Sequence, residues 1–240
     1  MERHTSPQGR QSQTRRRDPR GRQAETDRTS PTQRKDPRGR QAEAARNDQR
    51  LLDAARDVFS TLGADAPVAA VAERAGVGIG SLYRRYGTKD ELLQRLCVVA
   101  MEQAAEVART ALAEPDPWAG LVRYVNDCVA VGTGGLAPIA GTIPTTPQMW
   151  QAHHTARRLS DRVVARARAA GALRPGVTAL DISLLIEQFS RRGKADDEKA
   201  RRRLIAIATD GLHARNSGRL PGRPPSLRDY QARWRPHEGG

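Results

Sequence analysis

The stretch GVGIGSLYRRYGTKDELL, residues 76–93, decides the fold of this chain. Gly76 and Gly78 surround Val77, a pattern that favours a tight turn with one apolar side chain plugged between two helices. The segment SLYRRY that follows favours a short helix, and Gly87 provides its C-terminal stop. A turn followed by a short, polar helix is typical of a helix-turn-helix module.

A capping box opens the next helix. In the sequence TKDE, residues 88–91, the Thr88 side chain is expected to reach forward and the Glu91 side chain to reach back. Pro115 limits this helix, which we expect to run to about Ala113. Its apolar side consists of Leu92, Leu93, Leu96, Val99 and Ala100.

Two further helices are predicted ahead of the turn. The first ends at Gly63, and the second has Asp65 as its expected N-cap, Pro67 in its first turn and Gly76 at its end. Residues 46–94 are therefore predicted to form a three-helix DNA-binding domain of the helix-turn-helix type. The apolar face of its first helix consists of Leu51, Leu52, Ala55, Val58, Phe59 and Leu62.

Side chains on the short helix match the chemistry of DNA. Arginine can bond the O6 and N7 atoms of guanine, and tyrosine or serine hydroxyls bind phosphate. Lys89, at the start of the following helix, also suits a phosphate. Core packing is the alternative role for Tyr83 and Tyr86, and a solvated surface position is the alternative for Arg84. The candidate DNA-binding residues are Gly78, Ile79, Ser81, Tyr83, Arg84, Arg85 and Lys89.

Residues 51–93 resemble the DNA-binding domain of the TetR family of transcriptional regulators. The resemblance rests on VAERAGV, GSLYRRY and TKDELL, which occur in this order and at the family's spacing. It implies a homodimer whose two recognition helices enter successive major grooves of a palindrome-like operator. It also implies a helical second domain that binds a small effector.

The resemblance carries roles to only some positions. Tyr83 and Lys89 match positions that commonly bind the DNA backbone in the family, and Arg85 matches a position that faces the DNA. Ala66 and Pro67 stand where the family usually has phosphate-binding threonines, so the resemblance implies no such contact here.

The rest of the folded chain, residues 95–215, is expected to be a ligand-binding and dimerisation domain. Its apolar residues repeat with a helical period throughout, so the whole protein is predicted to be all-α. The loop 132–147 is expected to hold at most one short helical turn. Further helices are predicted at about 117–131, 147–170, 178–191 and 197–215.

Two sets of residues in this domain are candidates for binding. Apolar stripes on the last two helices favour a four-helix dimer interface, with core packing inside one subunit as the alternative. A few polar groups among apolar ones favour an effector pocket, with ordinary core as the alternative. The interface candidates are Ile182, Leu185, Ile186, Phe189, Leu204, Ile205, Ala208 and Leu212. The pocket candidates are Trp118, Tyr124, Cys128, Met149, Trp150 and His153.

The ends of the chain differ from its middle. Residues 1–45 hold no Val, Ile, Leu, Phe, Tyr or Trp, and the octapeptide DPRGRQAE occurs there at 18–25 and again at 36–43. Such a segment is predicted to be a disordered, arginine-rich tail, either simply solvated or adding affinity for the DNA minor groove. Residues 216–240 are predicted to be a Pro- and Arg-rich tail, with Leu220, Tyr230 or Trp234 as candidates to dock onto the body.

Composition and motifs narrow the function. The net charge of +14 favours a polyanionic partner, and the two cysteines, in apolar stretches, suit buried thiols in a cytoplasmic protein. We find no membrane-spanning run, no catalytic set, and no metal or cofactor motif. The prediction is a sequence-specific, ligand-responsive repressor that binds operator DNA as a homodimer. A nonspecific basic DNA-binding protein and, more weakly, a helical enzyme are the alternatives.

Overall fold

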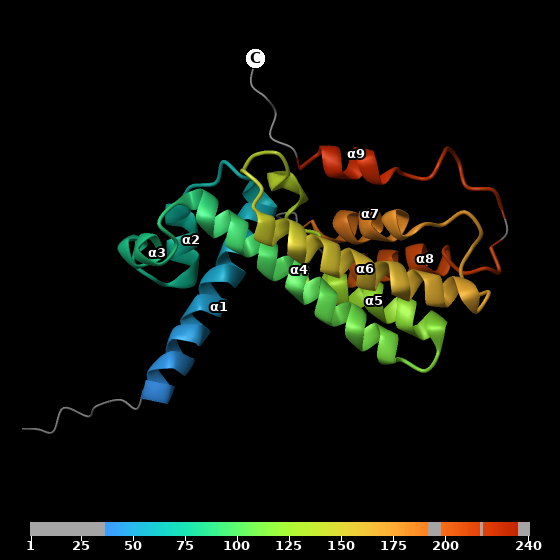
Figure 1. Cartoon of the computed structure of the whole chain (residues 1–240), viewed down its shortest axis with the longest axis horizontal. Helices are drawn as coiled ribbons and strands as arrows, with labels where there is room; N and C mark the ends of the chain where they lie inside the picture. Colours follow the sequence, from blue (N-terminus) through green and yellow to red (C-terminus); the bar gives the residue numbers. More distant parts are fainter. Residues whose placement is uncertain (1–36, 192–197, 217, 235–240) are drawn as a thin grey trace, which may run out of the picture.

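The computed structural model describes residues 37–191, 198–216 and 218–234 (Figure 1). Within these ranges helices and the loops between them make up the chain, and the one β-type pairing is an isolated antiparallel bridge between Leu173 and His213. The all-α prediction is confirmed. The elements are α1 (Pro37–Leu62), α2 (Val68–Ala75), α3 (Ile79–Tyr86), α4 (Lys89–Ala113), α5 (Pro117–Val131), a 3-10 turn η1 (Ala137–Ile139), α6 (Pro147–Ala169), α7 (Ala179–Ser190), α8 (Glu198–Asp210) and α9 (Leu227–Ala232).

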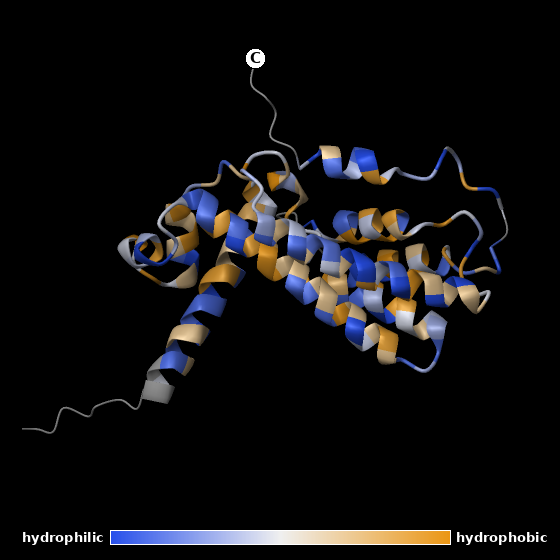
Figure 2. Ribbon diagram, in the orientation of Figure 1, coloured by the Kyte–Doolittle hydropathy of each residue, from blue (hydrophilic) through white to orange (hydrophobic). Residues whose placement is uncertain are grey.

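The first helix is longer than the sequence predicts. The predicted unfolded segment extends to residue 45, whereas α1 already begins at Pro37 and includes most of the second DPRGRQAE copy. Residues 41–47 are exposed, so burial does not hold this part of the helix. Ala, Glu, Gln and Arg all have high helix propensity, which explains the extension. Figures 1 and 2 show this end of α1 projecting from the body, with its strongly hydrophobic residues at the other end. The first DPRGRQAE copy lies outside the described residues.

The predicted helix-turn-helix is present as α2, the turn at residues 76–78 and α3. Gly76 has a left-handed backbone (φ 67°), which ends α2 and lets the Val77 amide donate to the Ala72 carbonyl at 3.0 Å. Val77 packs against the core around this turn, as predicted. The side chains of Phe59 on α1, Val71 on α2 and Leu82 on α3 are fully buried in the core of this module.

Two capping predictions were wrong in detail. Asp65 does not cap α2, because Pro67 is extended (ψ 139°) and the helix starts only at Val68, without a side-chain cap. Ala66 precedes this proline and is therefore also pushed towards an extended conformation, which separates Asp65 from the helix.

The second correction concerns the expected capping box. The Glu91 amide donates to the Thr88 hydroxyl at 3.1 Å, as predicted. The Thr88 amide, however, donates to the Tyr86 carbonyl at 2.6 Å. Gly87, with a φ of 66°, turns the chain tightly enough to bring this carbonyl to the Thr88 amide, so the Thr88 amide bonds to the backbone and not to Glu91.

Helix α4 connects the N-terminal module to the rest of the molecule. Its first half contributes Leu92 and Leu96 to the core beneath the short helices, and its second half contributes Ala105 and Ala108 to a second core. Small residues allow close approach there: a Cβ atom on Gly120 of α5 would lie 2.7 Å from the Ala111 carbonyl oxygen. Helices α5 and α6 both pack along α4 (Figure 1).

Polar contacts fasten the same junction. Arg56 of α1 donates to the Val131 carbonyl at 3.1 Å and to the Gln103 side chain on α4 at 2.6 Å. Gln94 of α4 donates to the Pro144 carbonyl at 3.0 Å, in the loop before α6. A shift of α4 relative to α5 and α6 must therefore move α1 or break these bonds.

The C-terminal segment returns to the body instead of extending away from it. Leu220 packs against the second core and Trp234 against the first. Between them, α9 lies alongside α7 (Figure 1). Both cysteines are buried and free of disulfide. No helix in the described ranges has the length and apolar content to cross a membrane.

Candidate DNA-binding surface and effector cavity

Helix α3 has one buried side and one exposed side. Leu82 is fully buried and Tyr86 is 8% exposed, one helical turn apart, so these two anchor the helix. Ile79 and Tyr83, also one turn apart, are 46% and 43% exposed. The core role considered for Tyr83 is thus excluded, whereas Tyr86 does pack in the core. Because Ile79 and Tyr83 are exposed one turn apart, they are available for contact with another molecule and are not part of the core.

The other candidate DNA-binding residues of this segment are exposed as well. Gly78, Ser81, Arg84 and Arg85 are exposed, and Arg84 donates to the Ser81 hydroxyl at 2.9 Å. Lys89 is only partly exposed, with its ammonium group 5.8 Å from the centre of the Phe59 ring. Six of the seven candidates are therefore open to solvent, whereas Lys89 is only partly exposed. Their contact with DNA remains a prediction.

A polar contact that the sequence did not reveal locks α3 onto α1. Asp48 accepts a hydrogen bond from the Arg85 Nε group and another, at 2.5 Å, from the Tyr86 hydroxyl. The Arg85 side chain is still 47% exposed, so part of its guanidinium remains accessible. No local pattern could show this contact, because Asp48 lies 37 and 38 residues from its partners.

The pKa values of this network reflect the contact. Burial acts to raise the pKa of Asp48, but the hydrogen bonds from Arg85 and Tyr86 outweigh it and lower the pKa below its ordinary value. Burial, with the hydrogen bond to Asp48, raises the pKa of Tyr86 to about 12. Asp48 is therefore a carboxylate and Tyr86 a neutral donor at neutral pH.

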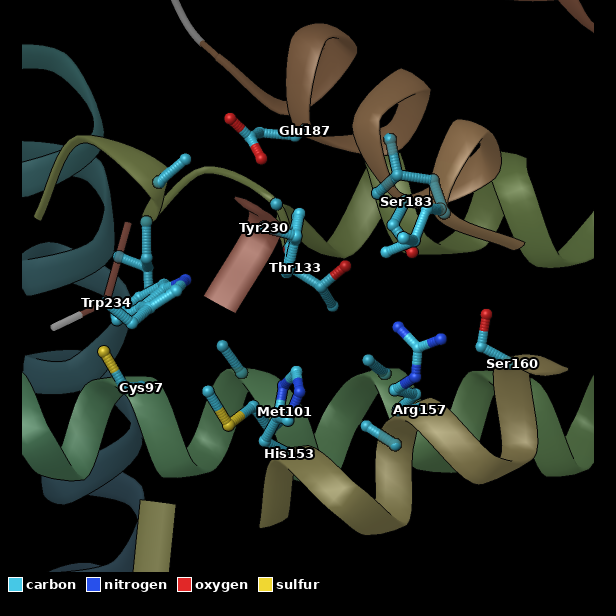
Figure 3. A pocket seen from close by; sticks show the side chains of 18 of the residues that line it. Cys97, Met101, Thr133, His153, Arg157, Ser160, Ser183, Glu187, Tyr230 and Trp234 are labelled. Carbon is cyan, nitrogen blue, oxygen red and sulfur yellow. The ribbon is translucent and has the colours of Figure 1, made fainter. Parts of the chain in front are cut away.

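A cavity of about 160 Å³ lies between α4, α6, α7, the loop after α5 and α9 (Figure 3). Four pocket candidates line it, namely Tyr124, Met149, Trp150 and His153. Trp118 does not, because its ring packs edge-on against His213 with centroids 4.5 Å apart. Cys128 does not either, since it is fully buried in the second core. The helical period groups Cys128 with Tyr124, but only the packing of neighbouring helices decides which one reaches a cavity.

The cavity wall also contains charged groups that sequence reasoning missed. Glu187 of α7 and Arg157 of α6 lie in this wall (Figure 3), and Asp161 of α6 lines the cavity as well. The Arg157 Nε atom lies 3.6 Å from an Asp161 carboxylate oxygen, so these two compensate each other. The Glu187 side chain is only 4% exposed, and its partners are arginines.

His153 provides a neutral polar group in the same wall. Its Nε2 atom is buried and has no hydrogen-bond partner within the described part of the chain. Burial lowers the pKa of His153, and the nearby His154 and Arg157 lower it further. A neutral imidazole with one unsatisfied nitrogen can donate to or accept from a bound molecule.

The predicted dimer residues divide into two groups. Ile182, Ile186 and Ile205 are at most 5% exposed and pack in their own subunit's second core. Leu185, Phe189, Ala208 and Leu212 are partly buried, and Leu204 is 53% exposed. Ile207, which the prediction omitted, is 58% exposed. An apolar stripe in a sequence cannot distinguish the inward from the outward side of a helix pair, which is why the predicted set mixes both.

Comparison with known families covers both halves of the chain. Residues 51–96 match the family described as bacterial regulatory proteins, tetR family. Residues 116–214 match the C-terminal domain of SbtR-like transcriptional regulators, a TetR C-terminal type. The chain belongs to the TetR family. The prediction of a TetR family transcriptional regulator is therefore confirmed. A search of curated proteins found no match.

Solved structures agree with the TetR fold. A TetR regulatory protein from Mycobacterium vanbaalenii is 27% identical, with 72% of this chain and 98% of that chain covered and a TM-score of 0.52. A TetR regulator from Streptomyces coelicolor is 23% identical (69% and 97% covered, TM-score 0.51). The regulator LfrR from Mycobacterium smegmatis, solved in complex with proflavine, is 20% identical (73% and 99% covered, TM-score 0.53). The last two support the TetR fold alone.

Proposed function

We propose that this TetR family regulator is a cytoplasmic repressor that binds a palindrome-like operator as a homodimer and releases it when an effector binds. The observation that carries the proposal is the surface of α3. Ile79 and Tyr83 are exposed beside Arg84 and Arg85, on a helix held in place by buried residues and by Asp48. A rigid helix with an exposed polar face can enter a major groove without reordering. No catalytic role is part of the proposal.

The side chains on this surface divide by chemistry. Arg85 keeps accessible N–H donors for guanine or phosphate, and the Tyr83 hydroxyl suits a phosphate oxygen. Ile79 at the start of α3 suits the methyl group of thymine. Gly78 and Ser81 allow close approach of the backbone to the DNA. Lys89 contributes positive charge at the edge of the surface.

The outward side of α7 and α8 is the proposed dimer interface. Leu204 and Ile207 lie one turn apart on α8 and are each more than half exposed. Exposed apolar side chains at neighbouring positions are typical of surfaces that pair with another chain. A two-fold dimer through α7 and α8 forms a four-helix bundle and places two α3 helices on one side of the DNA, at a required spacing of about 34–36 Å.

Effector binding is proposed in the cavity beside α4. Cys97 and Met101 of α4 line the cavity, and the same helix begins at Lys89 in the DNA-binding module. Arg56 ties that helix to α1, so an effector that shifts α4 also shifts the module. The effector must bind the released arrangement more tightly than the DNA-bound one. The complex of LfrR with proflavine supports a small aromatic molecule as a ligand of this fold.

Operator binding is tested by footprinting genomic DNA with the purified full chain, followed by gel-shift titration of the site at fixed salt. We expect Tyr83→Ala and Arg85→Ala each to weaken binding by about 1–3 kcal/mol per half-site. Arg109→Ala is the matched control, because Arg109 is an exposed arginine on α4 that pairs with Glu106 of its own helix. The circular dichroism melt of each variant should match that of the unchanged chain to within a few degrees.

Two results contradict this assignment. One is unchanged operator affinity in both α3 variants. The other is a specificity ratio over random DNA well below the roughly 10³ expected of a sequence-specific regulator.

A further inference from the structure

The buried carboxylate of Glu187 is the most unusual group in the effector cavity. Its side chain is 4% exposed and accepts two hydrogen bonds, each 2.9 Å long, from the two terminal amino groups of Arg233. Arg191 also donates to it, over 3.4 Å, but the Arg191 side chain is 50% exposed to solvent. The paired contact with Arg233 is therefore the main compensation for the buried charge.

That compensation comes from a weakly attached part of the chain. Arg233 directly follows α9, a helix of six residues with none fully buried. The connection to α9, residues 221–224, is exposed and rich in proline and glycine. Short segments with little buried surface detach at low free-energy cost compared with the core. The contact of Arg233 with Glu187 is therefore a main fastening of α9 to the body.

The C-terminal segment also fills the cavity. Tyr230 and Trp234 form part of its wall, on the side of Glu187 and Cys97 respectively (Figure 3). The remaining volume of about 160 Å³ is close to that of a benzene-sized cavity, and well below the ~300–1,000 Å³ of common ligand pockets. A larger ligand that also binds Glu187 has to take the place of Arg233, which moves α9 away.

Moving α9 away changes the charge of the cavity. With α9 docked, Arg157 balances Asp161, and Arg233 balances Glu187. Arg157, Asp161 and Glu187 are the charged residues that line the cavity within the described chain, and Arg233 contacts Glu187 without lining the cavity itself. Without Arg233, Glu187 keeps only the long contact with Arg191, so a ligand that covers the cavity in place of α9 buries this carboxylate with little compensation, which is strongly unfavourable. A cationic ligand removes that penalty, whereas a neutral or anionic one does not.

We propose that the effector of this regulator is an amphipathic cation whose ammonium or guanidinium group replaces Arg233 on Glu187 and displaces α9. The aromatic ring of Trp150 and the side chain of Met149 then contact the apolar part of the ligand. In the protein without effector, the Arg233 guanidinium group occupies the position on Glu187 that the cationic group of the effector takes when it binds. This inference rests on the proposed effector cavity and identifies the chemical class that the cavity binds.

The test is calorimetric titration of the full chain, without DNA, with 1-naphthylmethylammonium and with its neutral analogue 1-naphthylmethanol. Arg233→Ala should tighten binding of the cation by about tenfold, if α9 is docked in roughly 90% of molecules. Binding of the neutral analogue should change by less than half as much on a logarithmic scale. Arg228→Ala is the matched control, an exposed arginine on the same helix, and should leave both affinities unchanged.

A second variant separates the site from any effect on folding. Glu187→Gln keeps the shape of the side chain and removes its charge, so the preference for the cation over the neutral analogue should disappear. Equal affinity of Arg233→Ala for both compounds, or a cation preference that survives Glu187→Gln, overturns the proposal. Because these titrations contain no DNA, they decide the cation site independently, whereas the gel-shift titrations decide the repressor function.

Discussion

The contact of Asp48 with Tyr86 should contribute measurably to stability, and Tyr86→Phe isolates it. The substitution removes one hydroxyl from a side chain that is 8% exposed and leaves the packing of the ring unchanged. A hydrogen bond to a charged partner contributes about 1.5–3 kcal/mol. Solvent screens part of this value, because the Asp48 side chain is 21% exposed. We therefore expect a loss of about 1–2 kcal/mol in the free energy of unfolding.

The assay is urea denaturation followed by circular dichroism at neutral pH, as a double-mutant cycle with Asp48→Asn. The coupling energy between the two substitutions should be about 1 kcal/mol, because Tyr86→Phe removes the donor of this hydrogen bond and Asp48→Asn removes the charge that strengthens it. Gln49→Ala serves as the neighbouring control, since Gln49 is exposed and donates to Asp53 on its own helix. A loss below about 0.3 kcal/mol for Tyr86→Phe, or no coupling, refutes the role of this contact.

The same pair predicts how stability depends on pH. Since the pKa of Asp48 is lowered in the folded state, its contribution is present above the ordinary value of 3.8 and is lost as the pH falls through the lowered pKa. The pKa of Tyr86 is raised from 10.0 to about 12, so its contribution is present below pH 10 and is lost as the pH rises towards 12. In Tyr86→Phe the alkaline loss should be smaller, which unfolding curves between about pH 9 and about pH 12 would show.

Three further substitutions test packing and assembly. Leu82→Ala, in a fully buried position of α3, should cost about 2–5 kcal/mol in urea unfolding, and a cost under about 1 kcal/mol would show that α3 is loosely held. Gly134→Ala should cost about 1–3 kcal/mol, because its Cβ atom would lie 2.6 Å from the backbone of α7; Gly39→Ala, in open space, is the control and should not destabilise. Leu204→Glu should convert the dimer to monomer in sedimentation equilibrium while the helical circular dichroism signal is kept, whereas Leu62→Glu, equally exposed at 53% but within the DNA-binding module, should remain dimeric. A dimer that withstands Leu204→Glu contradicts the α7–α8 interface.

Local sequence signals were sufficient for most helices and for the DNA-binding module, but they missed the early start of α1 and the whole of α9, and they extended α8 to about 215 although it ends at Asp210. The predicted helix at 117–131 coincides with α5, and the one at 147–170 differs from α6 by one residue, because proline and capping residues define both starts. The recognition helix was identified for the same reason. Gly76 and Gly87 end α2 and α3, and both signals act within a few residues.

Local signals could not predict contacts between residues that are far apart in the sequence. The all-α fold, the helix-turn-helix module and the family could be predicted from the residues alone, since helix propensity, caps and apolar period are local properties of the chain. The packing of the helices was needed to show that Asp48 binds Arg85, that Ile182 and Ile205 face their own core, and that Arg233 neutralises Glu187. Each of these depends on which helix sides meet, and a helical period places side chains on a side without specifying what that side will contact.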